Sequence, residues 1–330
     1  MKEQTLRNCE LLIENRDAVK SVFPWNSGLL HLACAGIFTG KGKTADGAVL
    51  VNCKNLLKKR CGLFSNFRGV ARSPIASMLA AGEDDPERTL ENGLLAYRLL
   101  KRDFLASAYL PLAAMILAQT AQPSRYEAIA LRTRTIYGRL KKEHPLLTSG
   151  EDSAFCALMA LSQKTDDGMI EDAEQCYRAL KPNFFSSNAV QSLSHVLALC
   201  DGLPAAKCEK TMELFEKLKA AGHKYGTDYE LPTLGVLAMS GGALDEIVQE
   251  IAEIDDWLSR QKGFGLLGGV PRKQRLMYAG IVAQRDYVKD EAMQAAAVNG
   301  TVSLLVAQQA AMCAAVAASS AAAANASSSN

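Results

Sequence analysis

Apolar residues recur along this chain in two alternating patterns. In short stretches, apolar or small residues fill almost every position. In longer stretches they are spaced three, four and seven residues apart, which is the spacing of a helix that packs on one face. Residues 243–260 show this second pattern clearly, with a stripe formed by Leu244, Ile247, Val248, Ile251, Ile254 and Leu258.

The short stretches predict helices that are buried on most faces, and the longer stretches predict helices with one polar face. The short helices are expected at residues 29–38, 73–81, 109–118, 153–161, 189–199 and 231–239. The longer helices include residues 126–142 and 243–260. No stretch alternates apolar and polar residues for long enough to predict a strand.

Polar loops interrupt this pattern about every 40 residues, a period typical of helical-hairpin repeats. They lie near Pro24, Phe64, Phe104, His144, Phe184, Lys224 and Phe264. We therefore expect an all-α fold of repeated helical hairpins, with the short helices as an inner layer and the long helices as an outer layer. The pattern leaves open whether the array is an open α/α solenoid or a closed α/α toroid.

The repeat predicts a single helical-repeat domain over residues 1–318, followed by a disordered Ala/Ser-rich tail at 319–330. Residues 301–318 are apolar, but alanine dominates them and two glutamines lie in their middle. A spanning helix needs about 20 strongly apolar residues, so a terminal capping helix is the better prediction. The first residues lack the apolar core of a signal peptide, which favours a cytoplasmic location.

Composition narrows the choice of partner. The 330 residues carry a net charge of only +2, which gives no general field for nucleic acid or for a membrane surface, and neither is expected as a partner. The nine cysteines are odd in number and no two lie closer than eight residues. We expect them to be small buried hydrophobic residues and not disulfides or zinc ligands.

Two glycine-rich segments imitate phosphate-binding loops. Residues 36–44 end in Gly-Lys-Thr, but the first glycine of a P-loop would fall on Ile37, and a helix precedes the segment where the motif needs a strand. Residues 263–268 match GxGxxG, yet they too follow a helix. His31 and Cys34 supply at most half of a zinc site. We therefore predict no metal and no cofactor.

The candidate site residues lie in alternate loops. The loops after Phe64, His144 and Lys224 are longer than the loops between them, and alternate loops of a hairpin array are expected to gather on one rim. Arginines facing carboxylates there would suit a polar ligand, and two carboxylates would serve as acid and base. The candidates are Arg68, Arg72, Thr148, Glu151, Asp152, Asp228 and Glu230. The alternative is that Asp152 and Asp228 only cap the helices that follow them.

Two segments resemble a known bacterial family. Residues 137–152 read Tyr-Gly-Arg-Leu-Lys-Lys-Glu-His-Pro-Leu-Leu-Thr-Ser-Gly-Glu-Asp, and residues 157–161 read Ala-Leu-Met-Ala-Leu. They resemble the domain of unknown function 4003, over most of residues 1–300 and without the Ala-rich tail. The resemblance implies a bacterial protein, but it supplies no activity, cofactor or catalytic residue.

Two functions remain open. Hairpin arrays offer extended concave surfaces and no motif demands chemistry, so a binding or scaffold module for a protein partner or a small polar ligand is the leading prediction. The alternative is an α/α-toroid enzyme acting on a small polar or anionic substrate. In that enzyme Asp152 or Glu151 would be the acid or base, and Arg68 or Arg72 would hold the anion.

Overall fold

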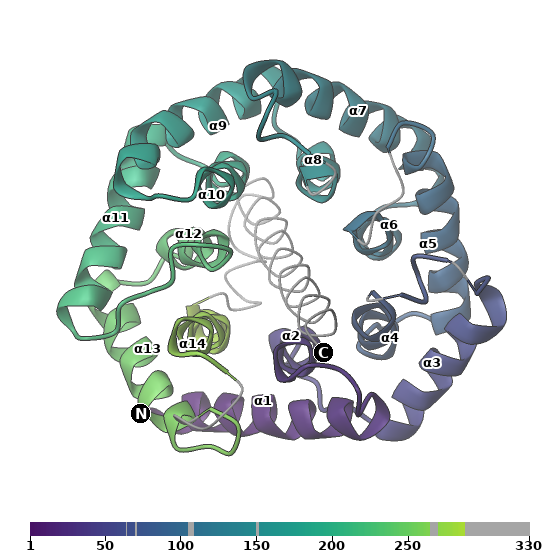
Figure 1. Ribbon diagram of the computed structural model, residues 1–330, viewed down its shortest axis with the longest axis horizontal. Helices are drawn as coiled ribbons and strands as arrows, with labels where there is room; N and C mark the ends of the chain where they lie inside the picture. Colours follow the sequence, from purple (N-terminus) through teal and green to yellow (C-terminus); the bar gives the residue numbers. More distant parts are fainter. Residues whose placement is uncertain (64, 70, 105–108, 150–151, 265–269, 288–330) are drawn as a thin grey trace. The chain divides into compact units, whose positions relative to one another are not determined.

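Every regular element in the described part of the chain is helical. The structure is a computed structural model, and it describes residues 1–63, 65–69, 71–104, 109–149, 152–264 and 270–287 (Figure 1). Within these ranges there are fourteen α-helices, two short 3-10 helices and no strand. The all-helical prediction is therefore confirmed. The predictions for residues 301–318 and for the tail lie outside the described residues.

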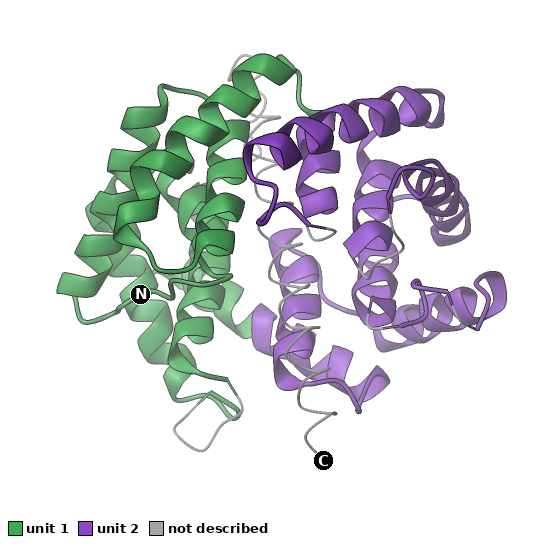
Figure 2. Ribbon diagram, turned by 45° about the horizontal axis from the view of Figure 1, so that its top comes forward, with its two compact units in different colours: residues 1–10, 162–314 green, residues 11–161, 315–330 purple. Residues whose placement is uncertain are grey.

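The chain divides into two compact units (Figure 2). Unit 2 contains residues 11–161, and unit 1 contains residues 1–10 and the described residues from 162 onward. Helix α1 (Glu3–Val22) contributes to both units. The further helices of unit 2 are α2 (Gly28–Gly40), α3 (Gly47–Arg60), α4 (Arg72–Ala80), α5 (Pro86–Leu100), α6 (Tyr109–Thr120), η1 (Pro123–Arg125), α7 (Tyr126–Glu143) and α8 (Asp152–Leu161). Those of unit 1 are α9 (Asp166–Leu180), η2 (Lys181–Asn183), α10 (Ser187–Leu199), α11 (Pro204–Ala220), α12 (Leu231–Met239), α13 (Leu244–Ser259) and α14 (Arg272–Tyr287).

Each unit has two layers of helices. In unit 2 the long helices α3, α5 and α7 each pack on the short helix that follows, and the short helices α2, α4, α6 and α8 pack side by side (Figure 1). Unit 1 repeats this arrangement, because α9, α11 and α13 pack on α10, α12 and α14 in turn. The short helices are enclosed by neighbours, and the eight consecutive residues Leu110–Leu117 of α6 are all buried.

Local sequence explains where the helices begin. The Asp85 side chain accepts from the backbone N–H of Arg88 at 2.8 Å, and Pro86 occupies the first turn of α5, where its lack of an N–H costs nothing. The first glycine-rich segment, residues 36–44, begins inside α2 and continues into a turn, where Gly42 has a φ of 66°. This helix-to-turn geometry lacks the strand that a P-loop requires. Most of the second glycine-rich segment, residues 265–268, lies outside the described residues.

The cysteines are buried as expected. The eight cysteines in the described part of the chain are all free thiols and all buried. Burial raises the pKa of Cys34 and of Cys200 to about 12, so these thiols stay protonated and unreactive near neutral pH. Among the described helices, none combines the length and the apolar character needed to cross a membrane.

Candidate functional site

The loops after α1, α3 and α5 in unit 2 each contact the next long helix along the chain. Lys54 of α3 donates to the carbonyl of Val22 at 2.8 Å, and its Nζ lies 5.0 Å from the ring centroid of Phe23. Asn26, in the same loop, donates to the hydroxyl of Ser73 at 2.6 Å. The loop after α1 is therefore tied to the end of α3 and to the start of α4.

Aromatic pairs make the next two of these contacts between a loop and a long helix. Phe67, in the loop after α3, packs edge-to-face on Tyr97 of α5 with centroids 5.2 Å apart. Phe104, after α5, packs on Tyr137 of α7 at 5.0 Å. We call the described residues of 20–27, 57–72, 98–104 and 140–149 the loop end of unit 2.

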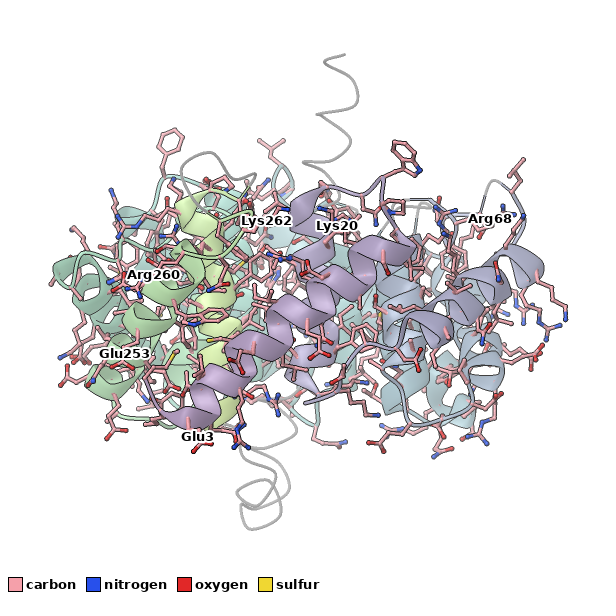
Figure 3. The ribbon with its side chains drawn as sticks, turned by 90° about the horizontal axis from the view of Figure 1, so that it is seen from below. Glu3, Lys20, Arg68, Glu253, Arg260 and Lys262 are labelled. Atoms are coloured by element: carbon pink, nitrogen blue, oxygen red, sulfur yellow. The ribbon has the colours of Figure 1, made fainter. Side chains whose placement is uncertain are left out.

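The loop end of unit 2 is strongly basic. Its four segments hold eleven lysines and arginines and only two acidic residues. Lys20 and Arg68 both lie toward the upper edge of the molecule in Figure 3. Five lysines at this end are exposed and form no ion pair with any residue that the structure describes, namely Lys20, Lys58, Lys59, Lys101 and Lys142.

The opposite end of unit 2 holds more acidic than basic residues. Residues 40–49, 81–91 and 119–128 hold seven acidic and four basic residues. The physical reason is the direction of the long helices, because acids are favoured at helix N-termini and bases at C-termini. Since the long helices of unit 2 all end at its loop end, their basic last turns add up there.

Three large apolar side chains are also exposed at the loop end of unit 2. Trp25 is 98% exposed, Leu63 70% and Leu146 97%, and each lies in a different loop. In unit 1, the loop after α9 carries Phe185, which is 98% exposed. The described part of the chain has only one other large apolar residue that is at least 70% exposed, Leu203.

Two of the predicted site residues, Arg68 and Arg72, belong to the loop end of unit 2. Arg68 is half-buried and donates to the carbonyl of Cys61 at 3.4 Å. Arg72 begins α4, and its guanidinium carbon lies 5.9 Å from the ring centroid of Phe23. Both arginines therefore brace the loops as well as adding charge.

Thr148 and Asp152 hold the turn before α8. The hydroxyl of Thr148 donates to the carbonyl of Leu140 at 3.2 Å, and the Thr148 carbonyl accepts from Lys141 at 2.5 Å. Asp152 is only 6% exposed, and its carboxylate accepts from the backbone N–H of Ser149 at 2.8 Å. This bond runs back from the first residue of α8 to the turn before it, like the returning half of a capping box. Glu151 lies outside the described residues.

Asp228 and Glu230 lie in unit 1, in the loop after α11. Asp228 is exposed, and the N-cap of α12 is Glu230, so Asp228 does not have the capping position that the sequence predicts for it. Glu230 is 3% exposed and accepts from the Asp228 N–H at 3.1 Å. Burial raises the pKa of Glu230, and the nearby Asp228 carboxylate adds to the rise. The buried hydroxyl of Tyr225 has no hydrogen-bond partner in the described structure.

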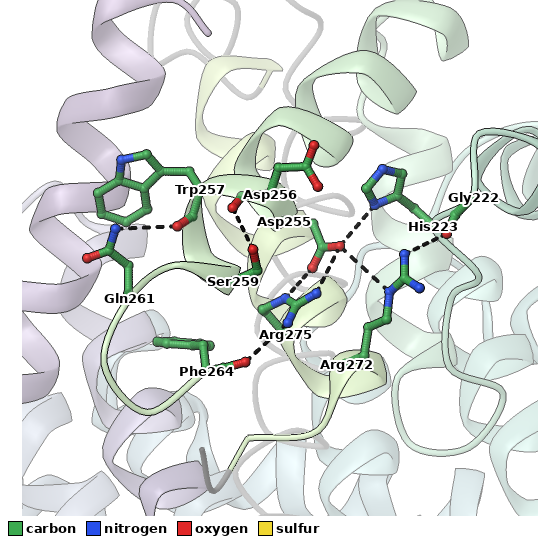
Figure 4. A network of polar contacts seen from close by, with 10 residues as sticks. All are labelled: Gly222, His223, Asp255, Asp256, Trp257, Ser259, Gln261, Phe264, Arg272 and Arg275. Carbon is green, nitrogen blue, oxygen red and sulfur yellow. Dashed lines mark hydrogen bonds and ion pairs between the residues drawn. The ribbon is translucent and has the colours of Figure 1, made fainter. Parts of the chain in front are cut away.

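A buried carboxylate joins three segments of unit 1 (Figure 4). Asp255 of α13 is 1% exposed, and it accepts from Arg275 of α14 at 2.5 Å and lies 2.9 Å from Nδ1 of His223. Arg275 also donates to the carbonyl of Phe264, and Arg272 donates to the carbonyl of Gly222. The cluster thus fastens the loops after α11 and α13 to the start of α14.

The same cluster contains the one group of possible metal ligands found among the described residues, which is His223, Asp255 and Asp256. Its chemistry does not suit a cation. Both Asp255 oxygens already accept from Arg275, and the Arg272 Nε lies 4.0 Å from one of them. Two guanidinium groups beside the carboxylate would repel a metal ion, so we interpret the cluster as a structural ion-pair network.

The candidate residues predicted from the sequence do not include the buried charges Lys207, Glu250 and Asp255, although the helical pattern holds a signal for two of them. Asp255 lies four residues after Ile251, on the apolar stripe of α13. Lys207 lies on the buried stripe of α11, is 2% exposed, and pairs with Asp172 at 2.8 Å. A charged residue at a stripe position predicts a buried partner, because an unpaired charge would be too costly there.

The fold and these surfaces define an all-helical protein with helices paired in two layers and with a basic loop end in one of its units. The chain belongs to the family described as "Protein of unknown function (DUF4003)", whose model matches residues 15–311. This confirms the resemblance drawn from the His144 region. No curated protein and no solved structure matches the chain.

Proposed function

We propose that this protein is a binding module whose loop end of unit 2 engages an anionic partner. The observation that carries the proposal is that the loops and helix ends at this end of unit 2 hold eleven basic residues and only two acidic ones. Five of these lysines are exposed and unpaired within the described chain, so they are free to meet a negatively charged surface. Charge of one sign gathered on one face raises both the affinity and the rate of association with an oppositely charged partner.

Retention on heparin, a soluble polyanion, tests this proposal. We expect the double variant Lys58→Glu/Lys59→Glu to elute at clearly lower salt than the wild type. The matched control is Arg88→Glu/Arg125→Glu, which changes the net charge equally but at the opposite end of unit 2, where both arginines are exposed. Equal loss of retention in the two variants would show that net charge, and not the loop end, governs binding.

A second candidate function is an enzyme that acts on a small polar or anionic substrate. One observation favours it: Glu230 is a buried carboxyl with a raised pKa, a property that clusters at functional sites. In unit 1 the candidate residues for this enzyme are Asp228 and Glu230, and in unit 2 they are Arg68, Arg72, Thr148, Glu151 and Asp152.

A ligand-dependent melting screen separates the two functions. A small anion that stabilises the wild type but not Glu230→Gln would support the enzyme. An anion whose stabilisation survives the Asp152→Asn change unaltered would remove Asp152 from the site.

We also propose that the protein is bacterial and cytoplasmic and that its paired helices form one repeat array. The recurrence of a long and a short helix within each unit supports the repeat. Open and closed forms of such an array differ in their scattering at small angles. Small-angle X-ray scattering of the full chain therefore distinguishes the α/α solenoid from the α/α toroid.

A further inference from the structure

We propose that the partner of the loop end of unit 2 is an anionic membrane surface, and that Trp25, Leu63 and Leu146 insert among its lipid headgroups. This inference rests on the proposed function and specifies the partner. It uses two independent properties of the same loops, which are their unpaired lysines and their exposed apolar tips.

The distribution of exposed apolar side chains is the first argument. Single exposed apolar residues are ordinary on protein surfaces and need no explanation. Here, however, three of the five most exposed ones in the described structure lie in three of the four loops at one end of unit 2. A fourth, Phe185, occupies the corresponding loop after a long helix in unit 1. A recurring position of this kind indicates a shared role for these side chains.

The chemistry of these side chains favours lipid. Tryptophan prefers the boundary between headgroups and acyl chains, because its ring is apolar and its N–H needs a polar neighbour. Leucine gains free energy when its side chain leaves water for that boundary. The lysines around them, Lys20, Lys58, Lys59 and Lys142, would lie at the level of anionic headgroups, where each basic residue adds attraction.

Other macromolecules fit the loop end less well. A protein interface has a contiguous apolar core that is depleted in lysine, whereas these apolar tips stand singly among lysines. Single-stranded nucleic acid binds through several stacking aromatic side chains, and this end exposes only Trp25 of that kind in the described residues. Duplex nucleic acid would use the lysines but would give the two leucines no role.

Co-sedimentation of the full chain with vesicles is the first test. The vesicles are made of phosphatidylcholine alone, or of phosphatidylcholine with about a third of anionic phosphatidylglycerol. We expect binding to the anionic vesicles only. The Lys58→Glu/Lys59→Glu variant should bind on the order of 30-fold more weakly, and the Arg88→Glu/Arg125→Glu variant should bind like the wild type.

The apolar tips have their own variant and control. We expect Trp25→Ser/Leu63→Ser/Leu146→Ser to weaken vesicle binding by about tenfold or more. The control is Leu131→Ser, because Leu131 is 62% exposed but belongs to helix α7 and not to a loop. Unchanged thermal melting of each variant shows that its fold is intact. Wild-type affinity in the triple variant would overturn insertion.

Fluorescence reports insertion directly. In a Trp257→Phe background Trp25 is the single tryptophan, and its emission should shift to the blue on anionic vesicles. Heparin retention that depends on the lysines, without any binding to anionic vesicles, would overturn the membrane inference and leave the proposed function standing. Binding to a single-stranded RNA homopolymer in place of vesicles would assign the surface to nucleic acid. If the Lys58→Glu/Lys59→Glu variant is retained on heparin as strongly as the wild type, the proposed function itself is overturned.

Discussion

At the scale of single residues, Glu230 shows how this fold holds a carboxyl group away from water. Its side chain occupies the space beside Gly226, where an added Cβ would lie 2.3 Å from the Glu230 carboxyl carbon. The absence of a side chain at Gly226 therefore allows the burial, and the burial raises the pKa of Glu230. Glutamate in such a position is favoured in its neutral form.

This raised pKa predicts a pH-dependent stability. Below the ordinary pKa of glutamate the group is neutral in both the folded and the unfolded states, so burial costs little. As the pH rises from that value through the raised folded pKa, the unfolded state releases its proton first and gains stability. We therefore expect the melting temperature of the wild type, relative to that of Glu230→Gln, to fall as the pH is raised through this window. A constant difference between the two proteins would contradict the assignment, and Glu246→Gln, at an exposed glutamate, is the control.

The capping residues illustrate what local sequence predicts at this scale. The cap that Asp85 and Pro86 form at the start of α5 can be recognised in the sequence, because a cap depends only on residues within one turn. The capping position considered for Asp228 differs from the observed one, because the loop after α11 turns so that Glu230 is the N-cap residue of α12. Lys207 and Asp255 lie at stripe positions, so their burial is visible in the helical pattern, but their ion-pair partners Asp172 and Arg275 lie on neighbouring helices and depend on the tertiary structure.

At the scale of elements, the packing of α5 on α6 depends on a glycine. A Cβ added at Gly93 would lie 2.4 Å from the Sδ of Met115, which is fully buried in α6. Gly138 of α7 offers the matched case, because a Cβ there would meet nothing within 4 Å. Alanine substitutions at these two glycines therefore distinguish the effect of helix propensity on stability from the effect of helix packing.

We expect Gly138→Ala to raise the free energy of unfolding by about 1 kcal/mol, since alanine favours the helix more than glycine does. Gly93→Ala gains the same propensity but crowds Met115, and overpacking costs about 1–3 kcal/mol. The net effect at Gly93 should be a loss of about 1 kcal/mol. Urea unfolding of the two variants measures both values, and a stabilised Gly93→Ala would disprove the close approach of α5 and α6.

At the scale of the whole molecule, the sequence predicts one domain over residues 1–318, whereas the chain shows two compact units. The prediction of a single domain is testable by calorimetry. If it holds, the full chain should unfold in one transition whose calorimetric and van't Hoff enthalpies agree. Two separate transitions would show that the units unfold independently.

The helical architecture was determined by the sequence itself. The spacing of apolar residues fixes which faces must be buried, and it placed helices such as α12 at residues 231–239 without knowledge of their neighbours. The residues around His144 likewise sufficed to suggest the family. Both kinds of information are local, because each depends on residues that lie close together in the chain.

The candidate surface was decided by the tertiary structure. A net charge of +2 conceals the separation of charge in unit 2, which arises only because its long helices end on the same side. The exposure of Trp25, Leu63 and Leu146 likewise depends on which side chains the neighbouring helices leave uncovered. Net charge is a sum over residues and carries no positions, so the basic loop end became visible only when segments distant in the chain were brought together.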